Sequence, residues 1–118
     1  WLTKDEAIIN TCIHHPWSTF RFTVNGYYQM FRGIQYIQNP AHIQQIPKNL
    51  PLFFVAGGDD PVGNNGKSVT QVCQQYKAAG IQDVQIKLYP GDRHEILNET
   101  DRDVVYADLL TWLNGHLA

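Results

Sequence analysis

The sequence predicts a domain of the α/β class that is built on a parallel sheet. Between residues 47 and 118 the hydrophobic pattern runs strand, helix, strand, helix, which is typical of a βαβ arrangement. The first of these strands is a near-continuous apolar run bounded by proline and glycine, as in strands buried on both faces. Residues 1–46 show helical periodicity and no strand pattern.

The composition limits the range of functions. The chain has 118 residues, a net charge of −2 with neutral histidines and 43% hydrophobic residues, enough for one domain with a modest core. No cluster of Lys and Arg favours nucleic acid binding, and no apolar run approaches the ~18 residues of a membrane-spanning helix. Cys12 and Cys73 fall on apolar helix stripes and are interpreted as small core residues. No His, Cys and Asp set has metal-ligand spacing, so we expect no metal and no cofactor.

The region 1–46 is predicted to be helical. Thr3-x-x-Glu6 has the pattern of a capping box, and a helix begins there and ends before Pro16. Residues 17–24 are predicted to form an extended loop, residues 25–38 a second helix and residues 41–46 a short helical turn.

The region 47–118 is predicted to contain both strands. The apolar run covers residues 50–56, and a helix follows over residues 65–79, with Gly80 in the position of a helix-ending glycine. Residues 84–89 alternate between apolar and polar side chains, which predicts a half-exposed strand near a sheet edge. Thr100-x-x-Asp103 has the pattern that caps a final helix.

Two candidate acid–base residues follow the two strands. Asp60 comes after the first strand and His94 after the second. Ligands of open α/β sheets bind beyond the carboxyl ends of the strands, so neighbouring strands would bring both side chains to one edge. An Asp there can orient a His that acts as a base toward a hydroxyl group. Asp59 is a competitor for the same role, and either loop can instead be an ordinary turn or a solvated segment.

The sequence offers no clear nucleophile. Its two serines, Ser18 and Ser68, lack the G-x-S-x-G context of a nucleophile elbow, and Ser68 follows Asp60 in the chain. Gly66-Lys67-Ser68 does not complete a phosphate-binding loop, because Pro61 occupies the position of the required glycine. We interpret this tripeptide as the start of a helix.

These motifs resemble a known family. The segments Gly57-Gly58-Asp59-Asp60-Pro61-Val62-Gly63, Lys87-Leu88-Tyr89-Pro90-Gly91-Asp92-Arg93-His94-Glu95 and Asn98-Glu99 are similar to the C-terminal part of α/β hydrolases of the monoglyceride lipase and lysophospholipase-like group, also called serine aminopeptidase S33-type. Trp1-Leu2-Thr3-Lys4-Asp5 and Phe20-Arg21-Phe22-Thr23 resemble its cap. The resemblance implies that Asp60 and His94 are the triad acid and base. It assigns residues 1–46 to the latter part of the helical cap and residues 47–118 to the C-terminal section of the core. His15 departs from the acidic residue that the family usually has there.

The resemblance also implies an activity. The parent protein would cleave carboxylic esters, such as lysophospholipids or monoacylglycerols, through an acyl-enzyme, with the nucleophile and oxyanion hole supplied by a missing N-terminal half. The 118 residues alone are then expected to be inactive and to self-associate, because the first strand lacks a neighbour. The expected location is cytoplasmic or peripheral to a membrane. The alternative is a non-catalytic binding or interaction module derived from a hydrolase. Some of the cap's aromatic residues are candidates for a substrate pocket: Phe20, Phe22, Tyr27 and Tyr28.

Overall fold

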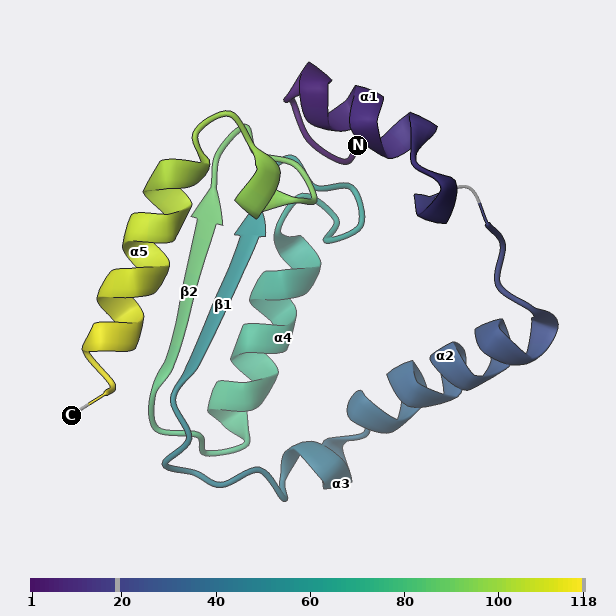
Figure 1. The fold of residues 1–118 in the computed structure, drawn as a ribbon. Helices are drawn as coiled ribbons and strands as arrows, with labels where there is room; N and C mark the ends of the chain where they lie inside the picture. Colours follow the sequence, from purple (N-terminus) through teal and green to yellow (C-terminus); the bar gives the residue numbers. More distant parts are fainter. Residues whose placement is uncertain (19, 118) are drawn as a thin grey trace.

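The computed structural model describes residues 1–18 and 20–117. The described strands form a two-stranded parallel sheet, and Figure 1 shows this sheet and its helices on one side of the molecule, with further helices extending from it. The elements are α1 (Glu6–His14), the 3₁₀ turn η1 (Pro16–Ser18), α2 (Val24–Ile37), α3 (Pro40–Ile43), β1 (Leu52–Gly57), α4 (Lys67–Ala78), β2 (Val84–Tyr89), the 3₁₀ turn η2 (Ile96–Asn98) and α5 (Arg102–Asn114). The predicted α/β class is confirmed.

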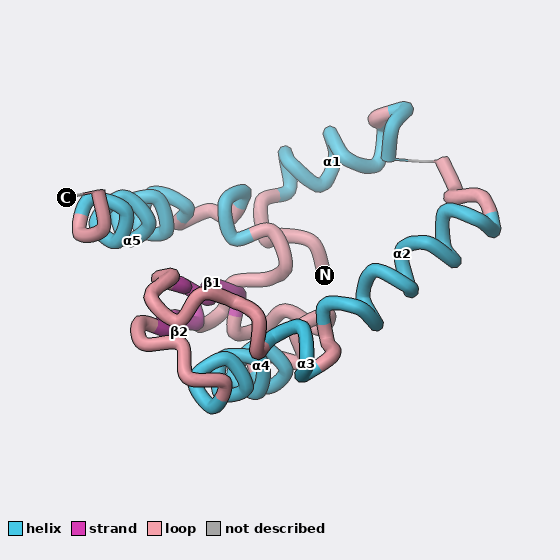
Figure 2. Tube along the Cα trace, turned by 90° about the horizontal axis from the view of Figure 1, so that it is seen from below, coloured by secondary structure: helices cyan, strands magenta, loops and turns pink. Residues whose placement is uncertain are grey.

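The sheet is the centre of a three-layer arrangement. β1 and β2 pair in parallel, with Leu52 opposite Val84 and Gly57 opposite Tyr89. Figure 2 shows α4 on one face of the sheet and α5 on the other. Each helix covers its own apolar cluster, as expected for a parallel sheet. The cluster under α4 is centred on Cys73, Ile81 and Val84, and the cluster under α5 on Tyr89, Ile96 and Val105.

A polar contact also fixes α5 to the second strand. The Tyr89 hydroxyl donates a hydrogen bond of 3.0 Å to Asp108 on α5, and the Lys87 ammonium pairs with the same carboxylate. Burial, followed by the bond to Asp108, raises the pKa of Tyr89 to about 12. Tyr89 therefore stays protonated at neutral pH and serves as a donor at the end of β2.

The two strands are buried to different extents, and only β2 follows the prediction. β2 alternates between buried and exposed positions as predicted, with Val84 and Tyr89 buried. β1 was expected to be buried on both faces, but its residues Leu52–Ala56 are only half-buried, and Leu50 lies before the strand with 44% of its surface exposed. The reason is that, among the residues described, no strand covers the other edge of β1.

Both predicted capping boxes are wrong. Asp5, not Thr3, caps α1, and its carboxylate accepts hydrogen bonds from the backbone N–H groups of Ala7 and Ile8. The Thr3 hydroxyl is buried instead and lies 2.8 Å from the carbonyl oxygen of Asn98. At the other end of the chain, α5 follows Asp101 with no side-chain cap, and Thr100 is exposed.

The region before the sheet follows the helical prediction with local differences. Part of the expected extended loop is the turn η1, and Thr23 caps α2 by accepting from the N–H of Gly26. Thr19, within that loop, lies outside the described residues. Cys12 is half-buried, whereas Cys73 is buried as expected. The described residues of α2 include no buried side chain.

We predict that the core around α5 depends on Val105, which is fully buried, and not on its neighbour Val104, which is 55% exposed. Val105→Ala leaves a cavity beside Tyr89 and Ile96, and we expect it to lower the free energy of unfolding by about 2 kcal/mol. Val104→Ala is the matched control, with an expected change below about 0.5 kcal/mol. Urea unfolding followed by tryptophan fluorescence measures both, and equal losses would contradict the assignment of the core.

The open edge of β1 predicts self-association of the 118-residue chain. Unpaired N–H and C=O groups beside half-buried apolar side chains favour pairing with a second copy. Sedimentation velocity over a range of protein concentrations measures this, and we expect the mean sedimentation coefficient to rise with concentration. A monomer that sediments identically throughout the series contradicts the prediction.

Candidate functional site

Asp60 and His94 meet at the carboxyl ends of the two strands. The His94 Nδ1 atom lies 3.1 Å from the Asp60 Oδ2 atom, within hydrogen-bonding distance. Asp60 is 6% exposed, whereas the His94 side chain is 39% exposed. Figure 1 shows that both strands point the same way, so the loops that follow them lie at one end of the sheet. The pair predicted from the sequence is thus brought together in space.

Asp60 is oriented by its own turn. Its second carboxylate oxygen, Oδ1, accepts a hydrogen bond of 2.8 Å from the backbone N–H of Val62, as Asp commonly does at the start of a turn. Its carbonyl oxygen accepts from the N–H of Asn65 at 2.8 Å. One oxygen is therefore held by the loop, and the other faces the imidazole. The competitor Asp59 is exposed and contributes its backbone N–H to the carbonyl oxygen of Asp92.

The contact between Asp60 and His94 selects one tautomer of the imidazole. A carboxylate accepts and does not donate, so the proton of the neutral ring belongs on Nδ1. The other ring nitrogen, Nε2, then carries the lone pair. A ring in this state can accept a proton at Nε2, and the carboxylate stabilises the imidazolium that results.

The two loops approach each other so closely that a side chain cannot fit between them. The backbone N–H of Gly58 donates to the Tyr89 carbonyl oxygen at 2.7 Å, and the N–H of Asp59 donates to the Asp92 carbonyl oxygen at 2.9 Å. A Cβ atom on Gly57 would lie 2.1 Å from the Arg93 carbonyl oxygen. The glycine after the apolar run is therefore required by the packing of the loop that carries His94.

A hollow of about 410 Å³ lies beside the pair. Its lining includes Asp60, His94 and Ser68 together with apolar residues of β1 and α4. Ser68 is in the first turn of α4, whose start at Lys67 confirms that Gly66-Lys67-Ser68 begins a helix. Among the hydrogen bonds of the described residues, neither Ser68 nor Ser18 bonds to His94.

The four aromatic candidates lie elsewhere. They precede or belong to α2, which extends away from the ends of the strands (Figures 1 and 2), and the hollow beside His94 is lined by other residues. Three of them join Phe31 in a chain of ring contacts at centroid separations of 5.6, 5.4 and 6.4 Å; this chain runs Phe20, Phe22, Tyr27, Phe31. Tyr28 lies under the Arg32 guanidinium at 5.6 Å. The aromatic side chains therefore form a separate exposed surface.

Sequence reasoning missed the contacts that the first residues of the chain make with His94. The ring of Trp1 lies 5.2 Å from the imidazole, centroid to centroid, and the Trp1 carbonyl oxygen accepts from the His94 N–H at 3.3 Å. Asp92 and Glu99, in the same loop, are fully buried. The resemblance had included both acids in its motifs, but no pattern in the sequence distinguishes a buried loop carboxylate from a solvated one.

We predict that Gly57→Ala disrupts the site because of the close approach to Arg93. The clash involves backbone atoms, so relief requires movement of the loop that carries His94, and we expect a loss of about 3 kcal/mol in the free energy of unfolding. The control is Gly33→Ala in α2, where an added Cβ meets nothing within 4 Å and is expected to stabilise the helix by up to about 1 kcal/mol. Urea unfolding of both variants measures these changes, and a neutral Gly57→Ala would contradict the packing argument.

The chain is similar to several known proteins. The family model described as serine aminopeptidase, S33 matches residues 1–101. A monoglyceride lipase of Saccharomyces cerevisiae is 34% identical over 92 residues, covering 74% of this chain and 28% of that protein. A monoacylglycerol lipase of Mycolicibacterium smegmatis is 34% identical over 70 residues, covering 57% of this chain and 22% of that protein. The crystal structure of a thermostable carboxyl esterase from Bacillus coagulans in complex with glycerol has a TM-score of 0.84 and 30% identity, covering 94% of this chain and 36% of that one.

The matches cover only part of the length of each relative. The chain spans about a quarter of the length of the two curated relatives. No helix within the described residues has the length and apolar character needed to cross a membrane. The family model covers most of the chain, and the fold and the relatives agree with it. The chain belongs to the serine aminopeptidase S33 family of α/β hydrolases.

Proposed function

We propose that this chain carries the acid and base of a serine hydrolase that cleaves carboxylic esters. The observation that carries the proposal is the contact of 3.1 Å between His94 Nδ1 and Asp60 Oδ2 at the carboxyl end of a parallel sheet. The lipase and esterase names of the relatives support an ester as the substrate class. We propose monoacylglycerols or lysophospholipids as substrates.

The proposed reaction forms an acyl-enzyme. His94 Nε2 takes the proton of a serine hydroxyl while the serine oxygen bonds to the ester carbonyl carbon. The tetrahedral intermediate then breaks its bond to the alcohol oxygen, and the imidazolium returns the proton to that oxygen. Water repeats the two steps and releases the acid. Throughout the cycle, Asp60 holds the tautomer and stabilises the positive charge on His94.

The serine of this reaction is proposed to come from outside residues 1–118. Ser18 and Ser68 lack the elbow context that exposes a nucleophile, and their described contacts do not include His94. We accordingly propose that the 118 residues are inactive by themselves. Residues 1–46 are proposed to be the latter part of a cap over the core section 47–118. The exposed aromatic side chains of this region are proposed to contact the acyl part of the substrate; they are Phe20, Phe22, Tyr27 and Tyr28.

The experiment is an assay of the full-length gene product on p-nitrophenyl butyrate. His94→Ala removes the base, and we expect kcat to fall by about 10⁴-fold, with Asp60→Asn giving a loss of similar order because it removes the tautomer control. His14→Ala is the matched control, because the His14 ring bonds to the Asn10 carbonyl oxygen on an exposed turn of α1. Unchanged turnover in His94→Ala refutes the proposal. A full-length protein without turnover favours the alternative of a non-catalytic module.

A further inference from the structure

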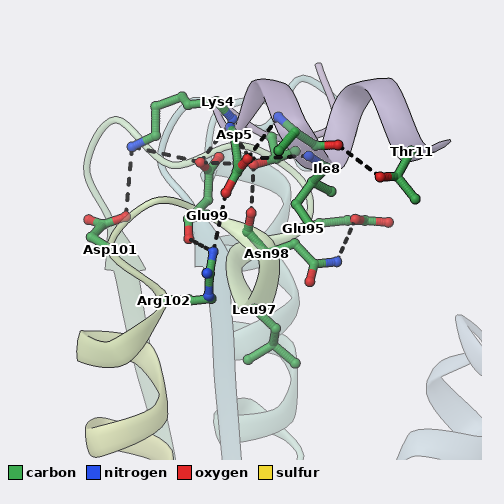
Figure 3. A network of polar contacts seen from close by, with 12 residues as sticks. Lys4, Asp5, Ile8, Thr11, Glu95, Leu97, Asn98, Glu99, Asp101 and Arg102 are labelled. Carbon is green, nitrogen blue, oxygen red and sulfur yellow. Dashed lines mark hydrogen bonds and ion pairs between the residues drawn. The ribbon is translucent and has the colours of Figure 1, made fainter. Parts of the chain in front are cut away.

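The loop that carries His94 is fixed by a carboxylate that is completely buried. Glu99 has no exposed surface, and each of its oxygens accepts hydrogen bonds. Its Oε1 atom accepts from the backbone N–H of Arg93 at 2.7 Å. Its Oε2 atom accepts from the backbone N–H of Lys4 at 2.9 Å and lies 3.1 Å from the Thr3 hydroxyl. One side chain thus joins two segments that are far apart in the sequence, as Figure 3 shows for the contacts around Lys4 and Glu99.

These two segments hold the imidazole of His94 in place. The bond from Arg93 to Glu99 fixes the peptide between Asp92 and Arg93, which lies one residue before His94 in the same loop. On the other segment, the carbonyl oxygens of Trp1 and Leu2 accept from the N–H groups of His94 and Glu95 at 3.3 and 2.8 Å. The Trp1 ring lies against the imidazole itself. Glu99 bonds to the main chain of both segments, and two further contacts join them: the Arg93 guanidinium donates to the Thr3 carbonyl oxygen at 3.1 Å, and the Lys4 ammonium pairs with Asp92.

The charge of Glu99 is compatible with this role. Burial alone would raise the pKa of Glu99, but the N–H groups of Lys4 and Arg93, the Thr3 hydroxyl and the Lys4 charge together hold its pKa below the usual range. The group is therefore an ionised acceptor at neutral pH. The Lys4 ammonium lies 4.0 Å from Glu99 and 2.8 Å from Asp92, so the buried negative charge has a counterion nearby.

We infer that Glu99 is a positioning residue for the His94–Asp60 pair. Its carboxylate holds the backbones of Arg93 and Lys4 in the one arrangement that presents His94 Nδ1 to Asp60. The relevance of this arrangement to catalysis rests on the proposed function, whereas the arrangement itself does not. Glu99 acts through the main chain and does not contact the hydrogen-bonded atoms of the pair.

The test is Glu99→Gln in the full-length protein. Gln keeps the size of the side chain but replaces one accepting oxygen with an NH₂ group, which faces a donor at either Arg93 or Lys4 and leaves it unpaired. We expect kcat on p-nitrophenyl butyrate to fall about 10- to 100-fold with little change in KM, because a small misplacement of a catalytic group costs about this much. In proton NMR spectra, we expect the downfield signal of the His94 Nδ1–H to be lost or to exchange faster with water.

Asp101→Asn is the matched control. It makes the same acid-to-amide change two residues further on, at a side chain that is 52% exposed and 3.9 Å from the Lys4 ammonium. We expect this variant to keep both kcat and the Nδ1–H signal. If Glu99→Gln does not fold, Thr3→Val removes the hydroxyl whose single proton faces both the Glu99 carboxylate and the Asn98 carbonyl oxygen, and we expect a smaller shift in the same two measurements.

The outcomes separate the two proposals. A folded Glu99→Gln protein with the wild-type Nδ1–H signal and kcat overturns the positioning role. A Nδ1–H signal that depends on Glu99, in a wild-type protein that hydrolyses no ester, supports the positioning role and refutes the proposed function. Equal losses in Glu99→Gln and Asp101→Asn indicate a general effect of charge and also overturn the role of Glu99.

Discussion

The contact between the loop after β1 and the loop after β2 is the constraint on which the site depends. The parallel register places Gly57 opposite Tyr89, and from that point the two main chains bond directly to each other. No side chain separates them, because Gly57 leaves space for the Arg93 carbonyl oxygen. Asp60 and His94 extend from opposite sides of this contact, and the distance between them follows from the backbone.

The burial of charged side chains around the loop that carries His94 is the second feature that determines the position of the imidazole. Removing a carboxylate from water is costly unless donors replace the lost hydration, and Glu99 has backbone N–H groups on both of its oxygens. Asp92 is equally buried, and burial raises the pKa of this group despite its hydrogen bond from Lys4. Both acids contact the first residues of the chain, so residues 3 and 4 help to hold the loop that carries His94.

The sequence was sufficient to predict the strands, the helix between them and the pairing of Asp60 with His94. Those features follow from short-range periodicity and from the rule that strand ends of a parallel sheet share an edge. The capping boxes were wrong for a physical reason. Thr3 has the local pattern of a cap, but its hydroxyl bonds to Asn98, a contact that no local pattern encodes. The contact between Trp1 and His94 was missed for the same reason.

The chain between the N-terminal contacts and the sheet is tethered at both ends. Asp5 is bonded to Arg102 at one end, and the Lys48 carbonyl oxygen accepts from the N–H of Gln82 at the other. The helices between these two contacts are α1, α2 and α3, and the chain that contains them leaves the core and returns to it. The hydrogen bonds around the imidazole are made by residues before and after these helices, so they do not depend on where α2 lies.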